Sequence, residues 1–232
     1  MKYAIQCLLA GLCLAGGAGR ATETENLGIR ILPAPGKVVV DGKIDDWDLT
    51  GGVFVCSDVE RLKENYAVWY HLMWDAEHLY ILARWRDPTP LNHPGSINGS
   101  YGFHGDCLQA RFIADYGTPE ERVSHWTCWM DKHGEHVVQG AYGRKFKSGK
   151  VADARDKGGA QAFQKGEASY VQEIVLPWRL ITADGKPPAP GEALRTTVEP
   201  NYTAGVAGRI SIKGIFRPGV APDRVFTFRA YK

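Results

Sequence analysis

The sequence predicts an all-β chain that folds as an antiparallel, two-sheet β-sandwich. Short stretches rich in Val, Ile, Trp, Tyr and Phe recur between clusters of Gly, Pro, Asn and Asp. A sustained period of three to four residues, which is typical of amphipathic helices, is almost absent. The short polar link Asp75–His78 joins two such stretches and predicts a hairpin. Many short strands with one apolar face each are buried best when two sheets stack.

The first 21 residues have the pattern of an export signal peptide. Lys2 is followed by an apolar run from Tyr3 to about Ala15 and then by the small residues Gly16–Gly19. No later run approaches the twenty apolar residues that a membrane span needs. We therefore expect residues 22–232 to form one β-sandwich binding domain that is secreted or periplasmic, with no membrane span.

The same patterns predict where the strands and the one helical piece lie. In the hairpin, Ala67–Trp74 pairs with Leu79–Arg86, and alternation places Leu79, Ile81, Ala83 and Trp85 on the core face. A short helical piece is expected at Pro177–Ile181. The other strands are predicted at Lys37–Val40, Val53–Cys56, Asp106–Ile113, Val123–Met130, Glu135–Ala141, Tyr170–Leu176, Arg195–Glu199, Arg209–Lys213 and Arg224–Ala230.

Composition and charge narrow the functional classes. The chain has 28 Lys and Arg against 26 Asp and Glu, a net charge of +2. The electrostatic field of so small a charge is too weak to attract a polyanion, and nucleic acid is not expected as a partner. The sequence contains neither G-x-S-x-G nor H-E-x-x-H, and we expect a noncatalytic protein. After signal cleavage Cys56, Cys107 and Cys128 remain, which allows one disulfide and one thiol or three buried thiols.

The segment Asp41-Gly42-Lys43-Ile44-Asp45-Asp46-Trp47 reads as a tight turn closed by a tryptophan. Asp bonds its own backbone in such turns, and Gly accepts a positive φ. The same carboxylates could supply oxygen ligands to a hard cation. We therefore keep calcium at Asp41 and Asp45 as an alternative to a purely structural turn.

Alternation also predicts a candidate ligand-binding face. On the strand from Asp106, Leu108 and Phe112 point inward and Gln109 and Arg111 outward. A sugar needs an aromatic face for its C–H patch and polar partners for its hydroxyls. The alternative is an outer sheet face that long loops cover. If Trp126 and Met130 point into the core, the binding set is Gln109, Arg111, His125 and Trp129, joined by Tyr101 from the long loop Asp87–Gly105.

Several segments together resemble carbohydrate-binding module family nine and the wider DOMON-like sandwiches of jelly-roll type. They are the aspartate-rich turn at residues 41–47, the hairpin Met73–Ile81 and its exit Asp87-Pro88-Thr89, the strand opening Gly105-Asp106, and the closing strand with Tyr170, Glu173, Ile174 and Leu176 before Pro177-Trp178. These anchors are spread in order over nearly the whole mature chain. The resemblance implies a carbohydrate ligand bound between aromatic faces.

A related branch implies a different ligand. The segment Ala83–Thr89 also resembles the b-type haem-binding subunits of ethylbenzene-dehydrogenase-type oxidoreductases. The DOMON-like relatives of these subunits use Met with His or Lys as axial ligands. Here those ligands would be Met130 and Lys213. The sequence lacks C-x-x-C-H, which excludes covalent haem. A third possibility is a noncatalytic part of a larger exported assembly. Fold alone does not choose among these.

Overall fold

The structure is a computed structural model that describes residues 30–56, 58–95, 105–142, 152–190, 192–203, 215–216 and 225–227. The expected signal peptide at 1–21, the expected strand Arg209–Lys213, and the candidate ligands Tyr101 and Lys213 lie outside the described residues. In the described part, no helix is both long enough and apolar enough to span a bilayer.

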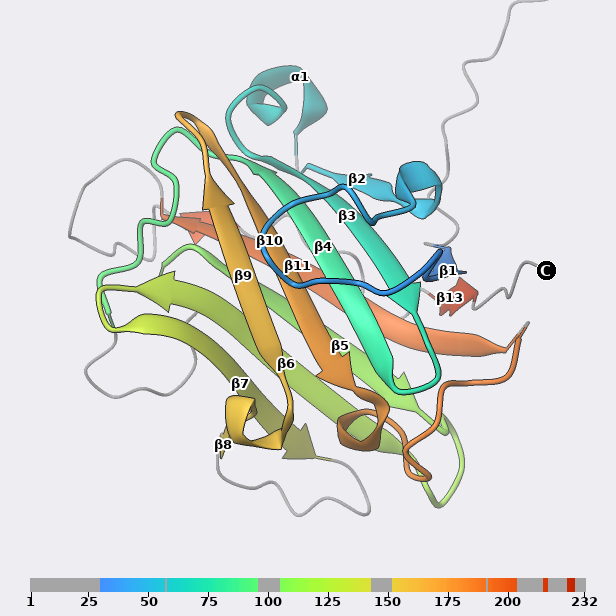
Figure 1. Cartoon of the computed structure of the whole chain (residues 1–232). Coiled ribbons are helices and arrows are strands. Elements are labelled where there is room, and N and C mark those ends of the chain that lie inside the picture. Colours follow the sequence, from blue (N-terminus) through green and yellow to red (C-terminus); the bar gives the residue numbers. More distant parts are fainter. Residues whose placement is uncertain are drawn as a thin grey trace, which may run out of the picture.

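Two β-sheets stack face to face and account for almost all of the described chain (Figure 1). In the part that the structure describes, the first sheet has six strands. Its strands are antiparallel apart from β1, which runs parallel to β3. They are, in spatial order, β1 (Ile31–Pro33), β3 (Ala67–Trp74), β4 (His78–Arg86), β10 (Ser169–Pro177) and β9 (Ala160–Lys165), with β2 (Val53–Val55) also paired to β3.

The second sheet has seven strands within the described ranges, all of them paired antiparallel. In order they are β12 (Ile215–Phe216), β11 (Ala193–Thr203), β5 (Cys107–Ala114), β6 (Arg122–Asp131), β7 (Gly134–Tyr142) and β8 (Ala152–Asp153), with β13 (Val225–Thr227) also on β11. The helical pieces are short: α1 (Val59–Leu62) and the 3-10 turns η1 (Leu49–Gly51), η2 (Arg155–Lys157) and η3 (Trp178–Leu180).

The predicted sandwich is confirmed, and its core includes the side chains that alternation assigned to the interior. The hairpin register pairs Trp74 with Leu79, as the short link requires. Trp85 stacks on Tyr170 across β4 and β10, with ring centroids 4.9 Å apart. The same core cluster holds the predicted inward residues Leu79, Ile81, Ala83, Leu108, Ala110, Phe112 and Trp126.

The expected strand Lys37–Val40 is wrong. This segment has no sheet partner, and Val38 packs instead on a small cluster that contains Trp47 and Tyr80. The cluster lies on the outer face of the first sheet, so the N-terminal segment covers part of that face. The sequence did not predict β1, β8, β9, β12 or α1. β9 has the sequence Ala-Gln-Ala-Phe-Gln-Lys, which contains no β-branched residue. The helical piece expected at Pro177–Ile181 is η3.

One buried carboxylate holds the aspartate-rich turn. Glu173 on β10 is fully buried and accepts hydrogen bonds from Asp41 N at 2.9 Å, Gly42 N at 2.5 Å and Trp47 Nε1 at 2.6 Å. Gly42 has a φ of +84°, and a Cβ there would meet the backbone of Phe163 at 2.8 Å. Glycine is therefore required at this turn both for its conformation and for its close approach to β9.

Two buried aspartates tie together the ends of the long loop. Asp87 follows β4, and its Oδ1 accepts from Thr89 N at 2.8 Å. Asp106 precedes β5 and accepts from Asn92 N and Thr203 N, both at 2.6 Å. Burial raises the pKa of Asp87, and burial together with the negative charge of Asp87 raises the pKa of Asp106 to about 9. We expect this pair to retain one proton at neutral pH.

The aspartate pair predicts a pH-dependent stability. Because the folded pKa is raised, the native state binds more protons than the unfolded chain from about pH 4 upward, and the free energy of unfolding falls as the pH rises toward 9. Between pH 7 and 8.5, which is above the ordinary pKa range of histidine, we expect the free energy of unfolding to fall by up to about 1.4 kcal/mol per pH unit. Urea unfolding at several pH values measures this fall. Asp106→Asn, which removes the group with the raised pKa, should flatten this profile. Equal slopes in the two proteins would contradict the assignment.

The cysteines do not form a disulfide with one another. Cys107 and Cys128 are buried, while Cys56 is partly buried and contacts Asp58 O and Tyr66 O through its thiol. Burial raises the pKa of the Cys128 thiol well above its usual range, so this thiol stays protonated. The structure therefore agrees with the alternative of three thiols.

Candidate functional site

The outer face of the second sheet brings together most of the predicted ligand-binding residues. The register pairs Arg111 directly with His125 on β6, and Gln109 with Thr127. On the other side of β5, Arg111 pairs with Thr197 and Gln109 with Glu199. Side chains that alternate with the core on three neighbouring strands therefore share one surface. We call this the β5/β6/β11 face; it consists of Gln109, Arg111, His125, Thr127, Thr197 and Glu199.

An ion pair lies at the centre of this face. Arg111 Nη1 donates to Glu199 Oε1 at 2.8 Å and lies 3.5 Å from Thr197 Oγ1. About a quarter of each charged side chain is exposed, so both groups are partly desolvated but still reach the surface. Gln109, Thr127 and Thr197 beside them are buried, with at most 5% of each residue exposed. The pair offers a fork of N–H donors next to a carboxylate acceptor.

His125 is neutral at physiological pH. Burial, together with the positive charge of Arg111, lowers the pKa of its imidazole to about 4 against the opposing charge of Glu199. A neutral imidazole has one N–H donor and one acceptor nitrogen. The face therefore combines a cation, an anion and a neutral group that can both donate and accept.

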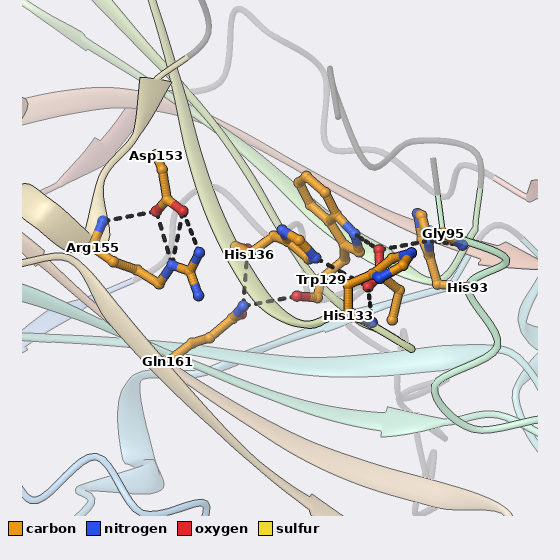
Figure 2. Close-up of polar contacts among 9 residues, drawn as sticks. His93, Gly95, Trp129, His133, His136, Asp153, Arg155 and Gln161 are labelled. Carbon is orange, nitrogen blue, oxygen red and sulfur yellow. Dashed lines mark hydrogen bonds and ion pairs between the residues drawn. The ribbon is translucent and has the colours of Figure 1, made fainter. Parts of the chain in front are cut away.

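The expectation of an exposed Trp129 is wrong. Its indole does lie on the outer side of β6, in a small cluster with Cys107 and Val138 apart from the main core, but only 1% of the residue is exposed. Its ring stacks on His136, with centroids 4.4 Å apart at 14°, and on His93, with centroids 5.6 Å apart at 26°. Figure 2 shows His93 and His136 near the indole. Histidines already contact the ring, so it is not an open platform.

Asp131 connects the polar groups around Trp129. It accepts from Trp129 Nε1 at 3.1 Å and from His133 N at 2.7 Å, and lies 3.0 Å from His136 Nε2. Burial alone would raise the pKa of Asp131, but these hydrogen bonds outweigh it and lower the pKa. Gln161 of β9 adds a link between the sheets, because its Nε2 donates to the backbone oxygens of Trp129 and His136 (Figure 2).

The remaining predicted ligands lie elsewhere. Met130 is partly buried near the end of β6, and its proposed partner Lys213 is not among the described residues. The Asp41 carboxylate accepts hydrogen bonds from Lys43 N at 3.0 Å and from Lys43 Nζ at 2.7 Å, and Asp45 is exposed in the same turn. Among the described residues, no group of three or more His, Cys, Asp or Glu side chains is arranged to hold a metal ion. Haem at Met130 and calcium at Asp41 and Asp45 stay predictions.

Sequence reasoning missed Glu199 and Thr197 as members of the site. Both lie in a strand that was predicted, and alternation from Arg195 places residues 195, 197 and 199 on one face. The missing information was which strand neighbours β5. β11 follows β5 in the chain by some 80 residues, a non-local pairing that a local pattern does not encode.

Comparison with solved structures places this architecture in a known class. The chain has the fold of a family 9 carbohydrate-binding module from Caldicellulosiruptor kristjanssonii. The structure of that module with glucose has 15% sequence identity and a TM-score of 0.54, and the match covers 87% of this chain and 95% of that chain. The structure with cellotriose has 16% identity and a TM-score of 0.56, and the match covers 88% of this chain and 95% of that chain. It is also similar to a "putative carbohydrate-binding protein" from Bacteroides uniformis (10%, 88%, 99%, TM-score 0.59). No family model matches the sequence, and no curated protein matches it.

The class is thus a family 9-like β-sandwich, as the sequence resemblance predicted. At these identities the likeness defines the fold, and the ligand has to be argued from the residues of this chain.

Proposed function

We propose that this chain is a noncatalytic carbohydrate-binding domain that holds sugar hydroxyls on the β5/β6/β11 face. The observation that carries the proposal is the partly exposed Arg111–Glu199 pair beside the neutral His125. The similar modules from Caldicellulosiruptor kristjanssonii bind glucose and cellotriose, which supports a sugar ligand for this fold.

The chemistry of the face suits neutral sugars. A hydroxyl group both donates and accepts, so it can donate to Glu199 while a neighbouring hydroxyl accepts from Arg111. Hydrogen bonds to ionised groups are stronger than those between neutral groups. Because the two charges already neutralise each other, the face attracts neither strong anions nor strong cations. Neutral His125 extends the same donor and acceptor pattern to β6.

The ligand would reach the protein outside the cytoplasm. The export-signal pattern of residues 1–21 supports secretion or a periplasmic location, where polysaccharides and their fragments are found. In this setting the domain acts alone or as the sugar-recognising part of a larger exported assembly.

Arg111→Ala should abolish most of the binding. Loss of a charged hydrogen-bond donor costs about 1.5–3 kcal/mol, which corresponds to a roughly 10- to 150-fold weaker Kd. Affinity electrophoresis in gels that contain β-glucan, xylan, mannan or starch measures the retardation, and isothermal titration with glucose and cellotriose measures Kd. Arg86→Ala is the matched control, because Arg86 forms an exposed ion pair with Glu64 at 2.6 Å on the first sheet.

Two results would contradict this proposal. If the wild-type protein binds no glycan in the panel, or if Arg86→Ala weakens binding as much as Arg111→Ala does, the face is not a sugar site. A Soret band in the purified protein would instead support b-type haem, the alternative that the sequence raised.

A further inference from the structure

A second polar and aromatic surface lies at one end of the sandwich. The turn that joins β5 to β6 and the segment that follows η3 lie near each other there (Figure 1) and border a groove of about 870 Å³. Tyr116 at the tip of the turn is 55% exposed. Its neighbour Asp115 has a φ of +55°, which turns the chain back toward β6 and leaves the phenol ring at the surface.

Arg195 connects this groove with the β5/β6/β11 face. It lines the groove, and its guanidinium carbon lies 3.4 Å from the centre of the Tyr116 ring. It also precedes Thr197 and Glu199 at intervals of two on β11, so it projects on their side of the sheet. The rise of a strand places Arg195 about 13 Å from Glu199 along β11. The groove is therefore at one end of the face that carries the ion pair.

The groove has the chemistry that a sugar chain needs. The phenol ring offers an apolar surface, and the guanidinium of Arg195 over it supplies N–H donors for hydroxyl oxygens. Carboxylates and cationic groups both line the groove, so it offers hydroxyl groups acceptors as well as donors. The charged lining residues are Asp115, Glu120, Asp184, Lys186, Glu192 and Arg195.

We infer that the ligand is an extended neutral glycan. One part of it binds the Arg111–Glu199 pair, and another part lies in the groove beside Tyr116. The inference rests on the proposed function and names the class of its ligand. A single sugar ring does not cover the distance between Arg195 and Glu199, whereas an oligosaccharide does. Affinity should therefore increase with the length of the glycan, and Tyr116 should contribute only to the longer ligands.

Titration with fragments of different length tests this inference. The glycan that retards the wild-type protein in affinity gels is used as its trisaccharide and its hexasaccharide, with glucose and cellotriose included in every series. We expect wild type to bind the hexasaccharide more tightly than the trisaccharide. Tyr116→Ala should weaken hexasaccharide binding by about tenfold and leave trisaccharide binding unchanged, while Tyr116→Phe should keep both.

The control is Trp69→Ala. Trp69 is also exposed, at 41%, but it lies on the outer face of the first sheet beside Phe54, and its removal should leave both affinities unchanged. Equal affinity of wild type for the two fragments, or no effect of Tyr116→Ala on the hexasaccharide, would overturn the inference and leave the proposed function intact. Absence of all glycan binding in wild type would overturn both.

Discussion

Replacement of Trp129 by alanine is expected to lower the free energy of unfolding by about 3–5 kcal/mol, the usual cost of deleting a large buried aromatic side chain. The indole is 1% exposed, and its Nε1 donates to Asp131. The substitution leaves a cavity between the rings of His93 and His136 and removes one hydrogen bond from a carboxylate. Urea unfolding followed by far-UV circular dichroism measures the loss.

Trp69→Ala is the control for this experiment, because it removes an equally large but exposed indole. It should lower the free energy of unfolding much less than Trp129→Ala, because this ring is 41% exposed and loses mainly its contacts with Phe54 and Arg84. If the Trp129→Ala protein unfolds like wild type but loses sugar binding, the buried position of Trp129 is contradicted and its predicted role as a binding residue is supported.

Glu173→Ala is the second substitution with a large expected effect. It leaves three donors without their acceptor: the backbone N–H groups of Asp41 and Gly42, and the Nε1 of Trp47. Hydrogen bonds to a charged group contribute about 1.5–3 kcal/mol each, so we expect a loss of at least about 3 kcal/mol. The turn at residues 41–47 should also detach from β9 and β10, which limited proteolysis would detect as new cleavage in this segment.

Glu173→Gln separates hydrogen bonding from charge. Its amide oxygen can still accept from one or two of the three donors, and burial already raises the pKa of Glu173 against the hydrogen bonds that lower it. We expect a loss of about half that of Glu173→Ala. Glu60→Gln, on the exposed helix α1, should be neutral. A Glu173→Ala protein as stable as wild type would show that the turn is held by its apolar contacts alone.

Alternation along the chain predicted the features that depend on local pattern. The hairpin of β3 and β4 and the inward row of β5 follow from a period of two, and so does the shared face of Arg111 and His125. The turn at residues 41–47 was assigned from Asp and Gly chemistry, and its positive φ at Gly42 agrees.

The sequence pattern could not predict features that depend on contacts between residues far apart in the chain. Whether Trp129 is exposed depends on His93, which lies 36 residues earlier, and on the ring of His136 from the next strand. The Arg111–Glu199 pair depends on β11 lying beside β5. Lys37–Val40 has strand-like composition but lies over a sheet face, because Glu173 holds the turn that follows it. A local pattern encodes none of these tertiary choices.

The most direct test of the β5/β6/β11 face as the sugar site is a nuclear magnetic resonance titration of the ¹⁵N-labelled protein with the trisaccharide of the glycan that retards it in affinity gels. We predict that amide shift changes gather on β5, β6 and β11 around Arg111, His125 and Glu199, with little change on the first sheet. Changes centred on Trp69 and Phe54, or no changes at millimolar sugar, would contradict the assignment of the β5/β6/β11 face as the sugar site.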